Sequence, residues 1–262
     1  VAVDRHLPAE MVVDILLPAG VGNVVLAPDD VSHAKQVVIS NDREVHERVD
    51  GRVHPGMEGR GVARHLHYYI LEYWRQHHRR GVIRLATVQP KVMHLSERTG
   101  FRRVGEFTIF VAPSMTEAVD SFTPLGLDQI DQALKQALST QVSAWHAHLY
   151  CQGWSWADPQ PKFVQEACQK GRAWLWREGQ GVLVLGEDTE DDAKLPLIEL
   201  LGCSSEHLTA LLLDYRRLAA CHGYQQAGWV ASLNPELQPY LDEAGFRRDW
   251  DKALSVYELS NG

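Results

Sequence analysis

The sequence predicts an α/β (α+β) protein built from two similar halves. Short β-branched runs alternate with amphipathic runs of helical period, and a glycine-rich turn joins a strand to a helix in the first half. An order of helix, strand, helix and strand occurs twice along the chain. With 262 residues, the chain is long enough for two domains.

The composition is that of a globular protein and argues against binding to nucleic acid or membranes. Hydrophobic residues make up 45% of the chain and the formal net charge is −8, whereas both kinds of binding need clustered excess Lys and Arg. No apolar run approaches about 18 residues and no signal-peptide pattern appears, so we expect no membrane span. The four cysteines lack metal-ligand spacing and are expected to be reduced in a cytoplasmic protein.

The first half is expected to contain a meander of strands followed by two helices. The strands are predicted at 21–27, 36–40 and 44–54, while the run 10–17 could be helix or strand. Apolar residues at helical spacing predict a helix over 65–80, which Gly81 ends. A strand at 82–88, a short helix from Pro90 that ends at Gly100, and a strand at 101–111 follow. Residues 112–127 have the composition of a linker.

The second half repeats this alternation after an additional helix. We expect helices at 128–148, 161–169, 206–222 and 235–244. Strands are expected at 173–176, 181–185, 195–201, 228–233 and 246–259.

The repeat can be counted directly. A His-Leu pair precedes a glycine by sixteen residues at His65 and Gly81, and again at His207 and Gly223. Gly-Phe-Arg-Arg then occurs at 100–103 and at 245–248. Agreement over four successive elements indicates that the halves share one fold, so we predict two domains, 1–120 and 121–262.

The glycine-rich turn lies between the predicted strand that ends near His54 and the helix that begins near Val62. Its glycines allow backbone N–H groups to point inward. The first turn of the helix adds unpaired N–H donors and the positive end of the helix dipole, which favours an anion by about 0.3–1 kcal/mol when exposed. The turn has neither the Gly-Lys-Ser/Thr of a P-loop nor the Gly-x-Gly-x-x-Gly of a dinucleotide fold. It predicts a phosphate site of another kind.

The turn resembles the pyrophosphate loop of the GNAT N-acetyltransferase superfamily. That loop reads Arg/Gln-x-x-Gly-x-Gly/Ala after a Val-x-Pro strand end. Here the residues 58–63 read Glu-Gly-Arg-Gly-Val-Ala after Val-His-Pro at 53–55, and Glu58 stands where the family has Arg or Gln. The second family motif, a helix that ends in Gly-Phe, is matched in part by 89–101 and by 234–246.

The resemblance implies two tandem domains, each with a mixed, mostly antiparallel sheet flanked by helices. It implies acetyl-CoA as co-substrate and no metal. The fold also needs a first strand and two helices, for which the second half has room between 127 and 170 but the first half has only 1–20. The implied cofactor-binding residues are Val53, His54, Glu58, Gly59, Arg60, Gly61, Val62, Ala63, Gln89 and Ser96.

The second copy lacks the group of glycines that leaves backbone N–H groups open to a phosphate. Its aligned segment, 201–205, reads Leu-Gly-Cys-Ser-Ser and keeps one glycine, although Ser204 or Ser205 could cap the next helix. We therefore expect the first repeat to bind the cofactor and the second to be degenerate.

The resemblance also places a catalytic base on the strand before the loop, ten or eleven residues before Glu58. Counting back reaches Arg48, which stays protonated, and then Glu47. His46 is the alternative, and the two side chains face opposite sides of a regular strand. Ser96 stands where the family has the tyrosine that protonates the departing thiolate.

The leading hypothesis is an N-acetyltransferase that transfers an acetyl group to a primary amine of a small molecule or peptide. The alternative from another class is a non-catalytic acyl-CoA-binding or protein-interaction module, favoured by Glu58 and Ser96. A tandem acyltransferase with another activated acyl donor is a third. We expect no nucleic-acid or membrane partner, and the chain could form a homodimer.

Overall fold

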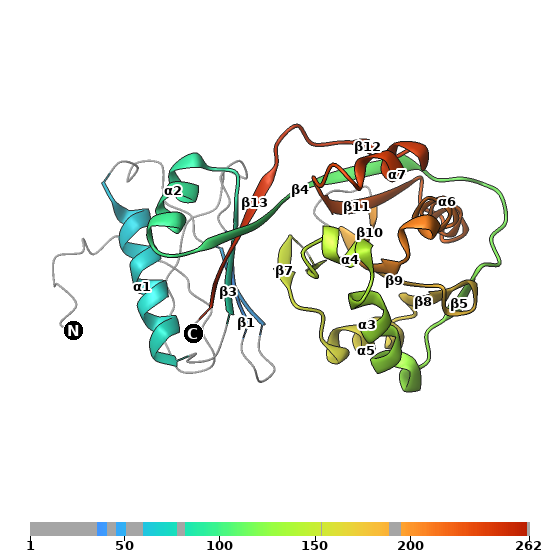
Figure 1. The fold of residues 1–262 in the computed structure, drawn as a ribbon, viewed down its shortest axis with the longest axis horizontal. Coiled ribbons are helices and arrows are strands. Elements are labelled where there is room, and N and C mark those ends of the chain that lie inside the picture. The colour runs from blue at the N-terminus through green and yellow to red at the C-terminus, as the bar shows by residue number, and fades with distance from the viewer. Residues whose placement is uncertain are drawn as a thin grey trace. The chain divides into compact units, whose positions relative to one another are not determined.

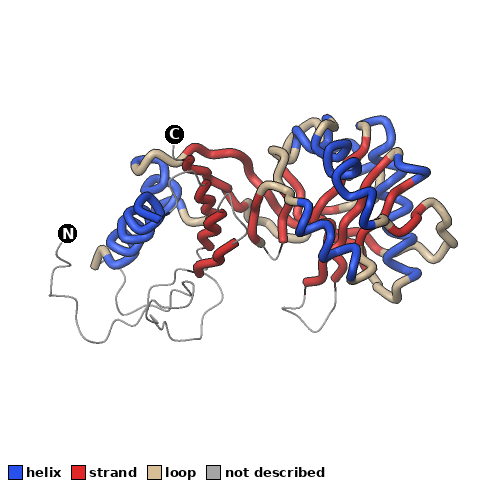
Figure 2. Tube along the Cα trace, turned by 90° about the horizontal axis from the view of Figure 1, so that it is seen from below, coloured by secondary structure: helices blue, strands red, loops and turns tan. Residues whose placement is uncertain are grey.

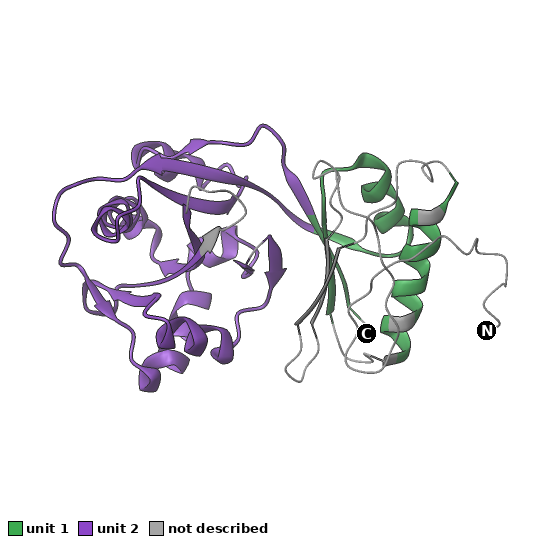
Figure 3. Ribbon diagram, turned by 180° about the vertical axis from the view of Figure 1, so that it is seen from behind, with its two compact units in different colours: residues 1–103, 256–262 green, residues 104–255 purple. Residues whose placement is uncertain are grey.

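The computed structural model describes residues 36–40, 46–50, 60–77, 82–152, 154–188 and 195–260. The chain forms two compact units: unit 1 is residues 1–103 with 256–262, and unit 2 is residues 104–255 (Figure 3). The elements expected at 10–17 and 21–27 lie outside the described residues. The division into domains 1–120 and 121–262 remains a prediction.

Unit 1 is a small sheet with two helices (Figure 1). Its elements are β1 (Gln36–Ser40), β2 (His46–Asp50), α1 (Val62–His77), β3 (Val82–Thr87), α2 (Pro90–Arg98) and, from residue 256, β13 (Leu254–Ser260). The strand order is β2-β1-β3-β13. The apolar face of α1, with Ile70, Leu71 and Trp74, packs on Ile83 and Leu85 of β3.

Unit 2 is a larger sheet covered by helices on both faces (Figure 2). Its strands are β4 (Arg102–Pro113, from residue 104), β5 (Phe122–Pro124), β6 (Tyr150–Gln152), β7 (Ser155–Ala157), β8 (Ala173–Trp176), β9 (Gly181–Asp188), β10 (Leu195–Cys203), β11 (Gln226–Ser232) and β12 (Arg247–Arg248). Its helices are α3 (Ile130–Leu138), α4 (Gln141–Trp145), α5 (Pro161–Gln169), α6 (Ser205–Cys221) and α7 (Gln238–Glu243). Short 3-10 turns lie at Leu127–Gln129 and Arg177–Gly179.

The sheet of unit 2 is mixed and mostly antiparallel, as expected. The strand order is β4-β11-β10-β9-β8-β5, with β12 on the other side of β4 and β6 paired with β7 as a separate hairpin. β10 and β11 run parallel, whereas β9, β8 and β5 pair antiparallel in succession. Alternate residues of the strands pack under α6 and α7 on one face and under α3 and α5 on the other.

The strand that ends each helix–strand repeat contributes to the other unit. β4 follows α2 of unit 1 in sequence, but from Val104 it belongs to unit 2, where Val111 is opposite Gly228 of β11. The last strand, β13, follows α7 of unit 2 but lies beside β3 in unit 1 from Val256 onward. Each sheet is therefore completed by a segment that is distant in sequence.

Most of the expected elements form, and two long ones are broken. The helix expected over 128–148 is wrong as a single helix: it stops at Leu138 and restarts at Gln141. Two hydroxyls end it by bonding to backbone carbonyls, Ser139 to Gln136 and Thr140 to Ala137 (both 2.8 Å), and Thr140 then caps α4. The strand expected over 246–259 is interrupted between β12 and β13, and β5 lies within the expected linker.

A buried hydroxyl joins the parallel strands of unit 2 to the helix that covers them. Tyr215 of α6 has no solvent exposure. Its hydroxyl donates to the carbonyl of Pro196 (2.7 Å) and accepts from the Gly228 N–H (3.1 Å), so it bridges β10 and β11 where their pairing begins. A buried polar group without hydrogen-bond partners is energetically costly. These two hydrogen bonds therefore fix the position of α6 relative to both strands.

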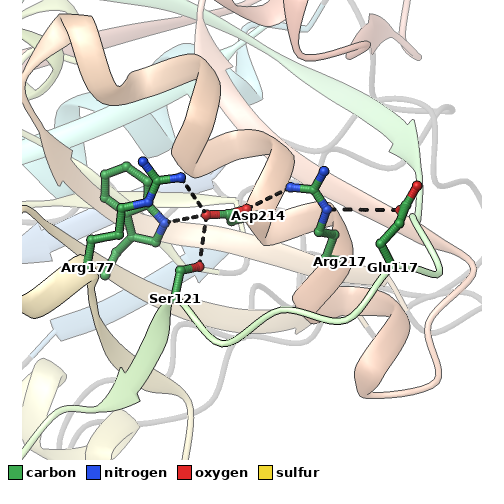
Figure 4. Close-up of polar contacts among 6 residues, drawn as sticks. Glu117, Ser121, Arg177, Asp214 and Arg217 are labelled. Carbon is green, nitrogen blue, oxygen red and sulfur yellow. Dashed lines mark hydrogen bonds and ion pairs between the residues drawn. The ribbon is translucent and has the colours of Figure 1, made fainter.

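The neighbouring residue, Asp214, anchors two loops to the same helix (Figure 4). Its carboxylate accepts hydrogen bonds from the Ser121 hydroxyl (2.8 Å), the Trp176 indole (2.9 Å) and the Arg217 guanidinium (2.7 Å). Arg177 approaches the same carboxylate at 3.4 Å while its guanidinium lies 4.3 Å from the centre of the Trp176 ring. Both carboxylate oxygens of Asp214 are thus engaged in contacts within unit 2.

The Gly-Phe pairs end helices in the same way in both repeats. Gly100 and Gly245 have φ values of +94° and +78°, which glycine adopts without steric cost. The N–H of the following Phe reaches back to the last turn, from Phe101 to the Ser96 carbonyl (3.0 Å) and from Phe246 to the Leu241 carbonyl (2.9 Å). The prediction of Gly100 as a helix C′ residue is confirmed.

Among the described residues, no helix is long and apolar enough to cross a membrane. Of the cysteines, Cys151 and Cys203 are buried, Cys168 is half-buried and Cys221 is exposed.

We predict that Gly245→Ala lowers the free energy of unfolding by about 2–3 kcal/mol. A side chain at positive φ costs about 1–2 kcal/mol, and the new methyl group would lie 2.8 Å from Nη1 of Arg216, which bonds to the Ala244 carbonyl. Urea unfolding at constant m-value measures the change.

The matched control is Gly223→Ala, which has a similar φ of +83° but no atom within 4 Å of the added carbon. The control should lose only the backbone part, about 1–2 kcal/mol. Equal losses in the two variants would contradict the proposed clash with Arg216.

Candidate functional site

The described part of the glycine-rich turn lies at the start of α1. Gly61 has a φ of +81°, and its carbonyl accepts the first helical hydrogen bond, from the N–H of His65 (3.0 Å). The N–H groups of residues 62–64 therefore precede the first intrahelical donor. The first turn of α1 has no acidic side chain, and Arg60 and Arg64 are exposed beside it. This end of α1 offers donors and positive charge of the kind that holds a pyrophosphate.

Several of the expected cofactor residues lie outside the described part of the chain. Val53, His54, Glu58 and Gly59 fall in the range 51–59, and the side chain of Val62 is also not described. Ala63 is half-buried in the first turn of α1.

The two residues expected from the second motif lie at opposite ends of α2. Gln89 is the N-cap residue of α2, and its N–H donates to the Thr87 hydroxyl (3.0 Å). Ser96 is completely buried and its hydroxyl donates to the Val92 carbonyl (2.9 Å). This hydroxyl is therefore engaged within its own helix.

The candidate bases Glu47 and His46 lie on β2, whose backbone the structure describes without its side chains. β1 lies between β2 and β3, with Val38 opposite Arg48 on one side and Arg84 on the other. The strand that carries the candidate bases is thus one strand removed from β3.

Buried polar contacts that the sequence did not predict join α1, α2 and β13 within unit 1. Nε2 of His67 lies 2.8 Å from the Thr99 hydroxyl, which connects the second turn of α1 with the end of α2. The phenol of Tyr257 donates to Glu97 (3.1 Å), the residue after Ser96. The first contact joins α1 to the end of α2, and the second joins β13 to α2.

A cluster of charged side chains in unit 1 lies on β3, β13 and the first residue of β4. Arg84, whose side chain is 5% exposed, donates from Nε (3.1 Å) and Nη2 (2.7 Å) to Oε2 of Glu258. Arg102 contacts the other carboxylate oxygen at 3.1 Å. An arginine inside a predicted buried strand was the sequence signal for this cluster, but its partner is 174 residues away.

In unit 2 the aligned loop is built differently. Its one glycine, Gly202, faces the end of α3: an added Cβ would lie 2.3 Å from Cα of Ala137. Ser204 is the N-cap residue of α6, as expected, but its hydroxyl makes no capping bond to the backbone and lies 3.1 Å from Nδ1 of His207. Gly202 therefore allows α3 to pack closely against this loop.

A buried carboxyl group, Glu199, lies at an irregularity of β10. The register with β9 shifts between Ile198 and Leu200, and the side chain of Glu199 covers Gly186, where an added Cβ would lie 2.1 Å from Oε1. Burial raises the pKa of Glu199 to about 7, although the positive charges of Arg172 and Lys170 oppose the shift. Among the described residues, no group of three or more His, Cys, Asp or Glu residues could hold a metal ion.

The fold is similar to that of solved acetyltransferase structures. One similar structure is a GCN5-related N-acetyltransferase from Sphaerobacter thermophilus, with a TM-score of 0.53 and 12% identity over 80% of this chain and 71% of that one. Another is a fungal glucosamine N-acetyltransferase region of a multi-domain β-N-acetylglucosaminidase, with a TM-score of 0.52 and 13% identity over 87% of this chain and 31% of that one. The sequence matches no protein-family model and no curated protein.

We predict that Glu199 makes unit 2 less stable as the pH rises from about 4.5 to about 7. The folded state holds the proton of Glu199 more tightly than the unfolded state, so stability is greatest below the unfolded pKa and is lost as the pH rises through the folded pKa. The loss over the whole range amounts to about 3–4 kcal/mol. Glu199→Gln should remove this slope, so the variant should be more stable than the original protein at pH 8.

Urea unfolding at a series of pH values measures this difference, with Glu166→Gln on the exposed face of α5 as control. Identical slopes for the original protein and Glu199→Gln would show that the carboxyl group titrates normally.

Proposed function

We propose that the chain is an N-acetyltransferase that transfers the acetyl group of acetyl-CoA to a primary amine of a small molecule or peptide. The observation that carries the proposal is the fold shared with GCN5-related N-acetyltransferases over 80% of the chain. The glycine at positive φ before α1 supports it, because this is the sequence segment that resembles the pyrophosphate loop of that superfamily.

The first turn of α1 fits the diphosphate of the co-substrate. Backbone N–H groups of this turn and the positive end of the helix dipole favour a dianion, and Arg64 adds an exposed positive charge. Gly61 allows the chain to enter the helix at a φ of +81°, which orients these donors. In this proposal, acetyl-CoA supplies the activated acyl group as a thioester.

The reaction is a direct transfer. The amine nitrogen attacks the carbonyl carbon, the C–N bond forms as the C–S bond breaks, and the amine loses a proton to Glu47 or His46, directly or through water. The thiolate takes a proton from solvent or a tyrosine, because the Ser96 hydroxyl donates to the Val92 carbonyl. The proximity of amine and thioester is the main contribution expected of the protein.

A second candidate function is a non-catalytic acyl-CoA-binding or protein-interaction module. The buried hydroxyl of Ser96 favours it, since this position has no free donor for the thiolate. The two functions differ in turnover: only the enzyme releases free CoA from acetyl-CoA in the presence of an amine.

We expect Gly61→Asp to abolish acetyl-CoA binding while unit 1 stays folded. The new carboxylate would stand at the start of α1 and repel the diphosphate, whereas Asp tolerates positive φ better than most residues. Calorimetric titration with acetyl-CoA measures the affinity. Gly179→Asp, at a φ of +94° with open space around it, imposes the same backbone change in unit 2 and should bind normally. Unchanged affinity in Gly61→Asp would remove the loop assignment.

We expect Glu47→Gln to lower kcat by about 10²–10⁴-fold with little change in acetyl-CoA affinity, because a general base acts on the chemical step. CoA release with an amine measures the rate. Glu72→Gln on the exposed side of α1 is the control. An unchanged rate in Glu47→Gln would transfer the role to His46 or to water.

A further inference from the structure

The two parallel strands of unit 2 part soon after they pair. β10 and β11 are paired at Leu197–Gly228 and Ile198–Trp229, after which β10 continues to Cys203 and β11 to Ser232. Each strand then leads to a helix, α6 or α7. In open α/β sheets, ligands bind outside the carboxyl ends of the strands, so a ligand of unit 2 would be expected at the ends of β10 and β11. We call this place in unit 2 the strand fork.

The α3–α4 segment of the chain, residues 137–146, lies against both sides of the strand fork. On the β10 side, Ala137 packs directly on the backbone of Gly202, and α4 lies beside β10 (Figure 1). Val142 of α4 is 1% exposed and belongs to the same buried cluster as Leu208 of α6. Helix α4 is therefore packed against the first strand and its helix.

On the β11 side, the contacts come from Trp145 and His146. The Trp145 indole donates to the Glu236 carboxylate, and its ring centre lies 5.6 Å from that of Tyr240 in α7. The His146 ring stacks on Trp229 at 5.6 Å with an interplanar angle of 17°. The same short segment thus reaches from β10 and α6 to β11 and α7.

His146 also satisfies the backbone of β11. The N–H of Ser232, the last residue of the strand, donates to Nδ1 of His146 (3.4 Å). Burial lowers the pKa of His146 to about 4, so the imidazole is neutral near pH 7 and keeps an acceptor nitrogen. The ring is also held by Phe107 of β4, at 5.0 Å between ring centres.

From these contacts we infer that residues 137–146 are the permanent occupant of the strand fork, so that unit 2 takes no acyl-CoA and the chain has one cofactor site. This inference rests on the proposed function. A ligand in the fork would have to expel α4, expose Val142 and His146, and leave the buried N–H of Ser232 without an acceptor, which is unfavourable. Ala137 fills the space beside Gly202, the one glycine of the loop, so a phosphate could not approach the backbone from that side.

Calorimetric titration with acetyl-CoA tests the number of sites. The original protein and the Gly179→Asp control should bind one equivalent per chain, and Gly61→Asp, altered in unit 1, should bind none. A site that persists in Gly61→Asp would place acetyl-CoA in unit 2 and overturn the inference. Absence of binding in the original protein would instead overturn the proposed function, and the next measurement then decides the inference alone.

Hydrogen exchange read by mass spectrometry tests the occupant directly. Residues 141–146 and the Ser232 amide should be protected and should not change with saturating acetyl-CoA. Faster exchange of 141–146 with acetyl-CoA would show that the ligand displaces α4, and would overturn the inference. His146→Ala should raise the exchange rate at Ser232 about tenfold or more, whereas His148→Ala, two residues away and exposed, should not. Equal exchange at Ser232 in the original protein and His146→Ala would also overturn it.

Discussion

The hydroxyl of Tyr215 fixes the geometry on which unit 2 depends. It joins Pro196 of β10 to Gly228 of β11 and ties both strands to α6. The strands pair next to this bridge, at Leu197–Gly228 and Ile198–Trp229. Asp214, one residue earlier, holds the segment before β5 and the turn after β8 on the same helix. Because these groups are buried, they need their partners, and the partners fix the position of α6.

The two repeats share an order of elements but use their glycines differently. Gly61 in unit 1 has a positive φ and opens a helix whose first turn carries no acidic side chain. Gly202 in unit 2 provides close contact with Ala137. A phosphate needs unobstructed N–H groups, whereas a packed helix needs the absence of a Cβ. One residue type therefore provides a backbone conformation in one unit and a close packing contact in the other.

The described residues of unit 1 both support and qualify the proposed acetyl transfer. The start of α1 has the donors for a diphosphate, but the hydroxyl of Ser96 is engaged within α2. The polar contacts of unit 1 also include Arg84 with Glu258 and Tyr257 with Glu97, which the last strand of the chain supplies. The proposed site therefore depends on the end of the chain as well as on its beginning.

The sequence by itself determined those helices and strands that are marked by residues nearby in the chain. The periodic helix at 62–77, the strand at 82–87, the glycine that ends α2, and the helix at 161–169 follow from spacing and from glycine and proline within a few residues. The sequence did not determine the break at Ser139 and Thr140, the interruption between β12 and β13, or the sheet that each strand joins. Nor did it reveal that His146 contacts Ser232 or that Arg84 pairs with Glu258. The last two contacts join groups 86 and 174 residues apart, whose approach is decided by burial and hydrogen bonding in the folded chain, whereas a local pattern constrains only the nearest turns.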